Sequence, residues 1–343
     1  MNTLKTILLT GALAMTTVQA TAHANPVFNI FELGVQADKA AAYDELSKAT
    51  VSQSIASEPG TLAMYSVKNA ENPELAYMIE VYADDAAYQK HLASPQYKAF
   101  IEQSPDVLTA HKERIELTPV YLGDKAAPIR LDENTIANFG HVTVNGKDAK
   151  AYRQIVLTEM VASVKNEPGV LAIYAGTMKS RPETWYFFEI YKSAEAVAQH
   201  REAPHFKSYL EDAKGMLADR AFSKVTPITL MNQGKLNFIA KEHHMYFIDI
   251  KIAEETMKQA DGQQLLAGHR QWFSKYVEQG NFLLLGPYKD IPFAGLIIAQ
   301  AESREALDAI LKEDAFYPDK AAYEIHEFSA NKIHPQITDF ISK

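Results

Sequence analysis

Cysteine is missing from the whole chain of 343 residues. Its absence excludes disulfides, thiolate metal ligands, thiol nucleophiles and any lipid anchor attached to a cysteine. The chain also lacks a cluster of lysine and arginine residues, and its formal net charge is −9. Because nucleic acids and anionic membranes are bound by basic surfaces, neither is an expected partner.

Long apolar runs are also absent, because even the apolar run near the N-terminus is short. Lys5 precedes an apolar run at 7–15, polar residues follow it, and a small-x-small pattern ends at Ala24. This arrangement is too short to span a bilayer and is typical of a cleaved secretion signal, here residues 1–24. The polar residues disfavour a retained anchor. We therefore expect a periplasmic or secreted protein, cut after Ala24, without a membrane partner once the signal is removed.

The chain contains a long internal repeat. The phrase "EPGTLAMYSV" begins at Glu58, and "EPGVLAIYAG" begins at Glu167. When residues 58–100 are aligned with 167–209 without a gap, 15 of 43 positions are identical. Repetition of this extent indicates a duplicated domain. We call the two segments copy one and copy two, and equivalent positions differ by 109 in number.

Each copy has the periodicity of strand, helix, strand, strand, helix and strand. In copy one, the expected elements are a strand at 28–35, a helix at 40–56, strands at 62–67 and 75–82, a helix containing His91 and a strand near 115–121. This order, βαββαβ, is that of a ferredoxin-like unit. The expected domains are 26–123 and 136–232.

The remainder of the chain repeats this order in a different sequence. Strands are expected at 245–252, in "GNFLLLGPYKD", at 294–301 and at 322–328, with helices at 253–279 and 303–312. Ser303 is the expected N-cap of the last helix. A third domain is therefore expected at 243–335, and the fold class is α+β with three ferredoxin-like βαββαβ units.

Both copies carry the motifs EPG-x-L-A-x-Y, P-E-x-x-Y-x-x-E-x-Y and H-x-x-x-P-x-[YF]-K in this order. With these motifs, the copies resemble the antibiotic biosynthesis monooxygenase (ABM) family, including its quinol monooxygenase branch. The resemblance implies a dimeric α+β barrel, in which the open faces of two four-stranded sheets pack together, here within one chain. It also implies oxidation of small aromatics, quinols or polycyclic phenols, with dioxygen as co-substrate and no cofactor.

The third unit contains "GHRQWF", "GPYKD" and "EDAFYPDKAAYEIHEF". These words resemble the YCII family of the same barrel superfamily. The resemblance implies that a helix histidine, His269, lies beside an aspartate of the Gly-Pro turn, Asp290. The Asp-Pro-Phe of the family is Asp314-Ala315-Phe316 in this chain. A homodimer formed through this unit is a further expectation.

Several residues of the repeated strands are candidates for substrate binding. Alternation along a strand places Glu80 with Tyr82 on one sheet face and Tyr77 on the other. A carboxylate beside tyrosines can orient a phenol or accept its proton; the alternative is a hydrogen bond that only holds the sheets together. The candidate substrate-binding residues are Tyr65, Glu80, Tyr82, Tyr174, Glu189, Tyr191, Asn29, Asn138 and Trp185.

The proline and glycine of the repeated phrase have a structural interpretation. Pro59 follows a helix that it terminates, and Gly60 is expected to take a positive φ before the next strand. Pro59 and Gly60 are therefore not candidates for chemistry.

The candidate catalytic residues are three histidines and an aspartate: His91, His200, His269 and Asp290. His91 and His200 lie on a helix of each copy, where a histidine can act as a base or simply pack. His269 projects from an aromatic helix face, and a partner such as Asp290 would fix its tautomer and raise its basicity, although a buried core histidine is the alternative.

No metal site is expected, because His243-His244 lacks the spacing of metal ligands. Haem degradation is disfavoured, because that branch of the superfamily binds iron through a histidine late in the helical stretch, where this chain has Phe100, Ile101, Tyr209 and Leu210. Haem and flavin stay open as alternatives. Copy two has the richer polar and aromatic set, with Arg181, Trp185 and His205 where copy one has Asn72, Ala76 and Gln96.

Three functions follow from the sequence. The first is an exported, cofactor-independent monooxygenase of quinols or phenols. The second is an acid–base lyase or isomerase that uses His269 and Asp290, with the two copies as scaffold. The third is a protein that binds small aromatics or haem without catalysis, because one fold hosts many functions.

Overall fold

The computed structural model describes residues 25–330, 334 and 336–337. The secretion signal expected at residues 1–24 lies outside the described residues. None of the described helices is long and apolar enough to cross a membrane. The chain divides between residues 240 and 241 into two compact units.

The first unit contains both copies, each with the expected order of elements. Copy one comprises β1 (Val27–Val35), α1 (Ala40–Ser57), β2 (Thr61–Asn69), β3 (Leu75–Tyr82), α2 (Asp85–Leu92), α3 (Pro95–Gln103) and β4 (Leu108–Asp124). Copy two comprises β5 (Ile136–Val144), α4 (Ala149–Asn166), β6 (Val170–Met178), β7 (Arg181–Tyr191), α5 (Ala194–Glu202), α6 (Pro204–Asp212) and β8 (Leu217–Asn232), and β9 (Asn237–Ile239) follows. The second helix of each copy is split because a proline starts a new helix at Pro95 and Pro204.

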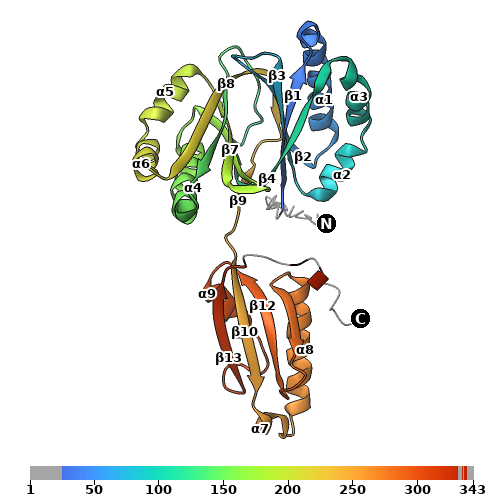
Figure 1. Cartoon of the computed structure of the whole chain (residues 1–343), viewed down its shortest axis with the longest axis vertical. Coiled ribbons are helices and arrows are strands. Elements are labelled where there is room, and N and C mark those ends of the chain that lie inside the picture. The colour runs from blue at the N-terminus through green and yellow to red at the C-terminus, as the bar shows by residue number, and fades with distance from the viewer. Residues whose placement is uncertain (1–24, 331–333, 335, 338–343) are drawn as a thin grey trace, which may run out of the picture. The chain divides into compact units, whose positions relative to one another are not determined.

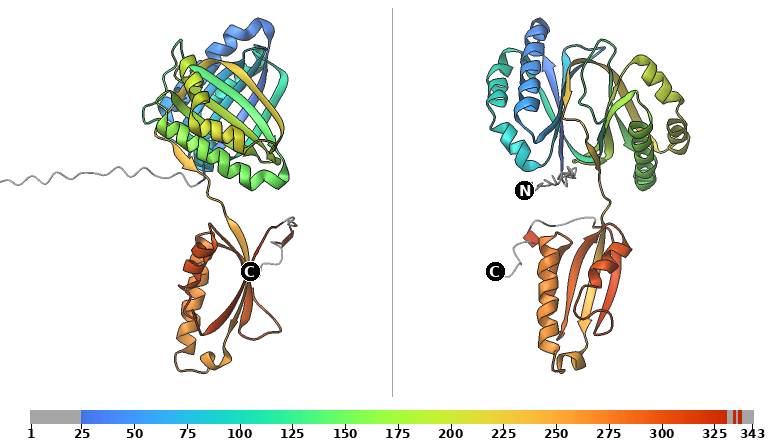
Figure 2. Two further views of the ribbon diagram at one scale, coloured as in Figure 1. Left: turned by 90° about the vertical axis from the view of Figure 1, so that its left-hand side faces the viewer. Right: turned by 180° about the vertical axis from the view of Figure 1, so that it is seen from behind.

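The strands of the two copies form one closed antiparallel barrel. The strand order is β1-β3-β2-β8-β5-β7-β6-β4, and β4 pairs back onto β1, with β9 added at the edge of β4. The helices lie outside the barrel, with α1–α3 on one side and α4–α6 on the opposite side (Figures 1 and 2). The expected pairing of the repeats within the chain is confirmed.

Two long strands join the halves of the barrel. The first part of β4 pairs with β1 of its own copy, and residues 117–124 pair with β6 of the other copy. In the same way, β8 pairs with β5 and then, from residue 225, with β2. The strand expected near 115–121 is therefore much longer, because it crosses from one sheet into the other.

The barrel interior is a packed core rather than a channel. Side chains of alternate strand positions fill it, among them Tyr77, Ile79, Phe139 and Phe188. The opposite face of the same strands packs against the helices, as Met78 and Tyr82 do in copy one. This is the alternation that the sequence predicts, and it places Glu80 on the helix side.

The repeated phrase forms the joint between a helix and a strand, with one difference from expectation. Helix α1 ends where Glu58 takes an extended conformation before Pro59. However, Gly60 is not among the residues with positive φ. A Cβ at Gly60 would lie 2.6 Å from the Cβ of Ala87, so glycine is needed here for the close approach of α2.

The second unit is a ferredoxin-like domain, and the α+β class is confirmed. Its elements are β10 (His244–Ile252), α7 (Glu254–Met257), α8 (Gly262–Glu278), β11 (Phe282–Pro287), β12 (Ala294–Ala301), α9 (Arg304–Leu311) and β13 (Ala321–Phe328). The sheet order is β11-β12-β10-β13, with α8 and α9 on one face (Figure 2). Ser303 accepts a hydrogen bond from Ala306 N and caps α9, as the sequence predicts.

Candidate functional site

Each copy has a cavity between the outer face of its sheet and its helices. The cavity of copy two has a volume of about 260 Å³, and its lining includes Glu159, Glu189, Tyr191, His200 and Arg220. The cavity of copy one is smaller, about 150 Å³, and its lining includes Thr50, Glu80, His91 and Phe100. Six equivalent positions line both cavities, among them Glu80 and Glu189, and His91 and His200, while the rest of each lining differs.

The predicted carboxylate and tyrosine pairs are present in both copies. Tyr82 donates a hydrogen bond to Glu80 Oε2 at 2.7 Å, and Tyr191 donates one to Glu189 Oε2 at 2.9 Å. Burial raises the pKa of Glu80 to about 7, although Tyr82 and Arg114 act in the opposite direction. A carboxyl with this pKa can exchange a proton near neutral pH.

The helix histidine of copy one is held by the glutamate of the repeated phrase. His91 Nδ1 lies 3.1 Å from Glu58 Oε2. Gln96 donates a second hydrogen bond to the same carboxylate. His91 is buried, and burial lowers its pKa although Glu58 favours the charged ring.

Copy two has the same histidine and glutamate within a larger polar network. Glu167 Oε1 lies 3.0 Å from His200 Nδ1 and 2.6 Å from His205 Nε2. Burial tends to raise the pKa of Glu167, but the hydrogen bonds from the two histidines outweigh it, and the net shift is downward.

Glu159 lies on the other side of His200. Ser163 donates a hydrogen bond to Glu159 Oε1 at 2.6 Å, and His200 Nε2 is 3.8 Å from the same oxygen. Burial raises the pKa of Glu159 to about 8, and the nearby carboxylates of Glu189 and Glu167 act in the same direction. The site therefore contains one carboxyl that favours its proton and one that is ionised.

The two predicted asparagines lie opposite the glutamates of the neighbouring strand. Asn29 is paired in register with Glu80, and Asn138 with Glu189. Asn138 lines the cavity of copy two. Asn29 is buried, its Oδ1 accepts a hydrogen bond from Arg114 at 3.5 Å, and its Nδ2 has no partner among the described residues.

Five predicted substrate-binding residues line neither cavity: Tyr65, Tyr82, Tyr174, Trp185 and Asn29. The hydroxyls of Tyr65 and Tyr174 are 2.8 Å apart in the barrel interior, and Tyr174 donates to Asp124 Oδ2 at 2.7 Å. Trp185 is buried against the ring of Tyr152 at a centroid distance of 5.4 Å. Tyr65 and Tyr174 form hydrogen bonds within the protein interior, and Trp185 packs there.

In the second unit, His269 has a different partner from the one expected. His269 Nδ1 lies 2.8 Å from Asp314 Oδ1, and Tyr323 donates a hydrogen bond to Asp314 Oδ2 at 2.7 Å. Asp290 is an exposed residue after β11. The predicted His269–Asp290 pairing is therefore corrected to His269–Asp314, because α8 packs against the turn before β13. His269 also lines a cavity of about 460 Å³ together with Tyr288.

The sequence reasoning missed several polar residues of these sites. Glu58 and Glu167 carried a signal, because they are identical acids in the repeated phrase. Asp314 carried one as well, as the aspartate of the altered Asp-Pro-Phe motif. Nothing in the sequence indicated Glu159, because copy one has Thr50 at the equivalent position.

The fold is of the dimeric α+β barrel type, with one candidate site in each copy. Family models agree: the model described as antibiotic biosynthesis monooxygenase matches residues 26–103 and 135–212, and the YCII-related domain matches residues 245–329. The chain contains two ABM domains followed by a YCII-related domain.

Two solved structures are similar to the barrel unit. One is a protein from Lactobacillus acidophilus NCFM, provisionally assigned as a monooxygenase, with 29% identity and a TM-score of 0.59 over 62% of this chain and 99% of that chain. The other is a protein from Fusobacterium nucleatum with the same provisional assignment, 25% identity and a TM-score of 0.60 over 63% of this chain and 99% of that chain. No curated protein matches the chain.

Proposed function

We propose that the barrel unit is a monooxygenase of small quinols or phenols and that the substrate occupies the cavity of copy two. One observation carries this proposal: the cavity combines the rings of Phe187 and Phe206 with the Glu189–Tyr191 pair and the cation of Arg220. Aromatic walls suit an aromatic ring, and the cation suits a phenolate. The provisional assignment of both similar structures as monooxygenases supports the same reaction.

The proposed reaction needs no external reductant. One atom of dioxygen enters the quinol ring, and the other leaves as water with two hydrogens of the substrate, which supplies all four electrons and becomes a hydroxyquinone. The carboxylate of Glu189 accepts the phenolic proton, because the phenolate gives up electrons to dioxygen more readily. Asn138, which lies opposite Glu189 in register, orients the ring.

The size of the cavity narrows the substrate class. Its volume of about 260 Å³ is below the roughly 300–1,000 Å³ of sites for drug-sized ligands. We therefore propose substrates of one or two rings rather than larger polycyclic phenols.

Oxygen uptake with a panel of one-ring and two-ring hydroquinones tests the proposal. We expect uptake by the wild type and a loss of kcat/KM of roughly 10²–10⁴-fold in Glu189→Gln, as for removal of a general base. The matched variant Glu80→Gln in copy one should change kcat/KM little. An absence of oxygen uptake by the pure wild type would refute the proposal. A loss of kcat/KM only in Glu80→Gln would contradict the assignment of the substrate to copy two.

The YCII-related domain is a second candidate site, for an acid–base lyase or isomerase. The contact of His269 with Asp314 beside a cavity of about 460 Å³ favours it, because an aspartate fixes the tautomer of a catalytic histidine. Oxygen uptake that survives in His269→Asn, while another activity is lost, would support this role. Retention of every activity in that variant would contradict it.

We also propose that the protein is exported and that the YCII-related domain pairs with a second copy. The sequence of residues 1–24 supports the first point, and the exposed Leu283 and Leu284 of β11 support the second. N-terminal sequencing of the protein from a periplasmic fraction should begin at Asn25. Sedimentation should give twice the chain mass, and a smaller mass in Leu284→Lys; a wild-type chain that sediments singly would contradict the pairing.

A further inference from the structure

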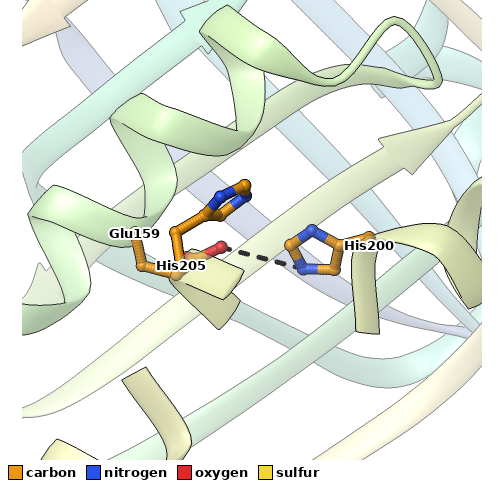
Figure 3. A group of neighbouring side chains, drawn as sticks. All are labelled: Glu159, His200 and His205. Carbon is orange, nitrogen blue, oxygen red and sulfur yellow. Dashed lines mark ion pairs between the residues drawn. The ribbon is translucent and has the colours of Figure 1, made fainter. Parts of the chain in front are cut away.

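Three side chains of copy two converge from three different helices. Glu159 lies on α4, His200 on α5 and His205 on α6, and they point towards one another (Figure 3). One potential ligand atom of each lies within 4.8 Å of those of the other two. Glu159 and His200 are buried, and His205 is partly buried.

The spacing within this cluster is unlike that of a hydrogen-bonded pair. His200 Nε2 and Glu159 Oε1 are 3.8 Å apart, which is too long for a hydrogen bond. Two ligand atoms that each lie about 2.0–2.2 Å from one tetrahedral zinc ion are about 3.3–3.6 Å apart. The gap between the histidine and the carboxylate is therefore wide enough for a shared ion.

Glu167 provides the outer support that a metal-bound histidine usually has. Its Oε1 contacts His200 through Nδ1 and His205 through Nε2. A carboxylate on one ring nitrogen fixes the tautomer and leaves the other nitrogen with a free lone pair. For His200, this free nitrogen is Nε2, the one that is nearest to Glu159.

Copy one is an internal comparison for this cluster. It retains the histidine and its glutamate, as His91 and Glu58, with a contact of 3.1 Å. At the positions of Glu159 and His205, however, it has Thr50 and Gln96. Only copy two therefore has the complete set of ligand side chains, while both copies share the supporting pair.

We propose that copy two binds one divalent first-row transition-metal ion through Glu159, His200 and His205, with Glu167 positioning both histidines. Two imidazoles and a carboxylate, without thiolate, suit Zn²⁺ or Fe²⁺. The cavities of about 260 and 410 Å³ that share Glu159 leave room for a further ligand on the ion. This inference goes beyond the proposed monooxygenase function, whose reaction needs no metal.

The test measures binding and is independent of activity. Protein freed of metal by a chelator is titrated with Zn²⁺ by calorimetry, and with Co²⁺ by visible absorption, which reports the ligand geometry. Anaerobic titration with Fe²⁺ distinguishes the two candidate ions. We expect one ion per chain, and a visible Co²⁺ spectrum of low coordination number.

The variants use residues that the chain already accommodates in copy one. Glu159→Thr and His205→Gln should abolish the tight site, and Glu167→Gln should weaken it by roughly 10–100-fold, as for loss of an outer partner. His111→Gln, an exposed histidine bonded to Glu32, is the control and should change nothing. The double substitution Thr50→Glu and Gln96→His should add a second ion.

Two results would overturn the proposal. One is the absence of stoichiometric binding to the folded wild type, which would leave the cluster as a hydrogen-bonded histidine pair on Glu167. The other is binding that Glu159→Thr and His205→Gln leave unchanged while circular dichroism shows that both variants fold. Neither result bears on oxygen uptake, so the monooxygenase proposal stands or falls separately.

Discussion

The ring of His200 is hydrogen-bonded to the carboxylate of Glu167, with 3.0 Å between Nδ1 and Oε1. The equivalent pair in copy one, His91 and Glu58, is joined at 3.1 Å. Each glutamate is the first residue of the repeated phrase, and each histidine lies on the helix that covers the cavity. The glutamate at the junction between helix and strand therefore holds a histidine that lines the cavity.

Removal of either glutamate charge should destabilise the barrel. Glu58→Gln leaves His91 and Gln96 with a poorer acceptor in a buried site, so we expect the free energy of unfolding to fall by about 1–3 kcal/mol. Urea unfolding measures this change. Glu45→Gln, at an exposed ion pair with Lys48, is the control and should stay within about 0.5 kcal/mol. Equal effects of the two substitutions would contradict the role of Glu58.

The stability contributed by Glu80 and Glu159 should fall as the pH rises from about 5 to 9. Burial raises the pKa of Glu80 to about 7 and that of Glu159 to about 8, from 4.5. Both groups thus bind protons in the folded protein where the unfolded chain has lost them. Their contribution is full below pH 4.5 and is lost as the pH passes 7 and then 8.

Thermal unfolding of the metal-free protein between pH 5 and pH 9 measures this loss. We expect the melting temperature of Glu159→Gln to fall less than that of the wild type over this range, because glutamine does not ionise. Parallel melting curves for the two proteins would contradict the raised pKa of Glu159.

The carboxylate of Asp124 should be a strong determinant of barrel stability. It accepts hydrogen bonds from Tyr174, Asn232 Nδ2 and the backbone of Leu236, all within 2.8 Å. Asp124→Ala leaves three buried donors unpaired, so we expect a loss of several kcal/mol in urea unfolding. Tyr65→Phe removes only one hydroxyl contact and should cost about 1 kcal/mol. A smaller loss for Asp124→Ala than for Tyr65→Phe would refute this ranking.

The partner of His269 can be identified by nuclear magnetic resonance. Asp314→Asn should change the nitrogen shifts of the His269 ring and the exchange of its Nδ1 proton, because Asp314 accepts the hydrogen bond from that nitrogen. Asp290→Asn should leave the ring signals unchanged, because Asp290 is exposed. Reversal of these two results would restore the pairing expected from the family resemblance.

Most of the fold could be predicted because local patterns record it. Alternation and helix spacing gave the order of elements in each copy, and the family resemblance implied the closure of the two copies into one barrel. The length of β4 (Leu108–Asp124) could not be predicted, because its second part pairs with β6 of the other copy. A strand that crosses between sheets depends on pairing with residues far away in the sequence, which local sequence patterns do not record.

The candidate sites were predicted less completely, for two physical reasons. Strand alternation identified Glu80 and Glu189, but it could not tell that the rings of Tyr65 and Tyr174 fill the barrel interior. Contacts between helices are also not recorded in local sequence patterns: Glu159 joins the site only because α4 packs beside α6, which in turn packs beside α5.

The segment between β4 and β5 joins the two halves of the barrel covalently, and β4 and β8 pair with strands of both halves. In a barrel formed by two identical chains, every substitution appears in both sites. Here Thr50 and Glu159 differ at equivalent positions while they share one barrel. Because both halves are one chain, the unlike sites are present in equal amounts at any dilution, and no exchange of subunits can produce a barrel with two sites of the same kind.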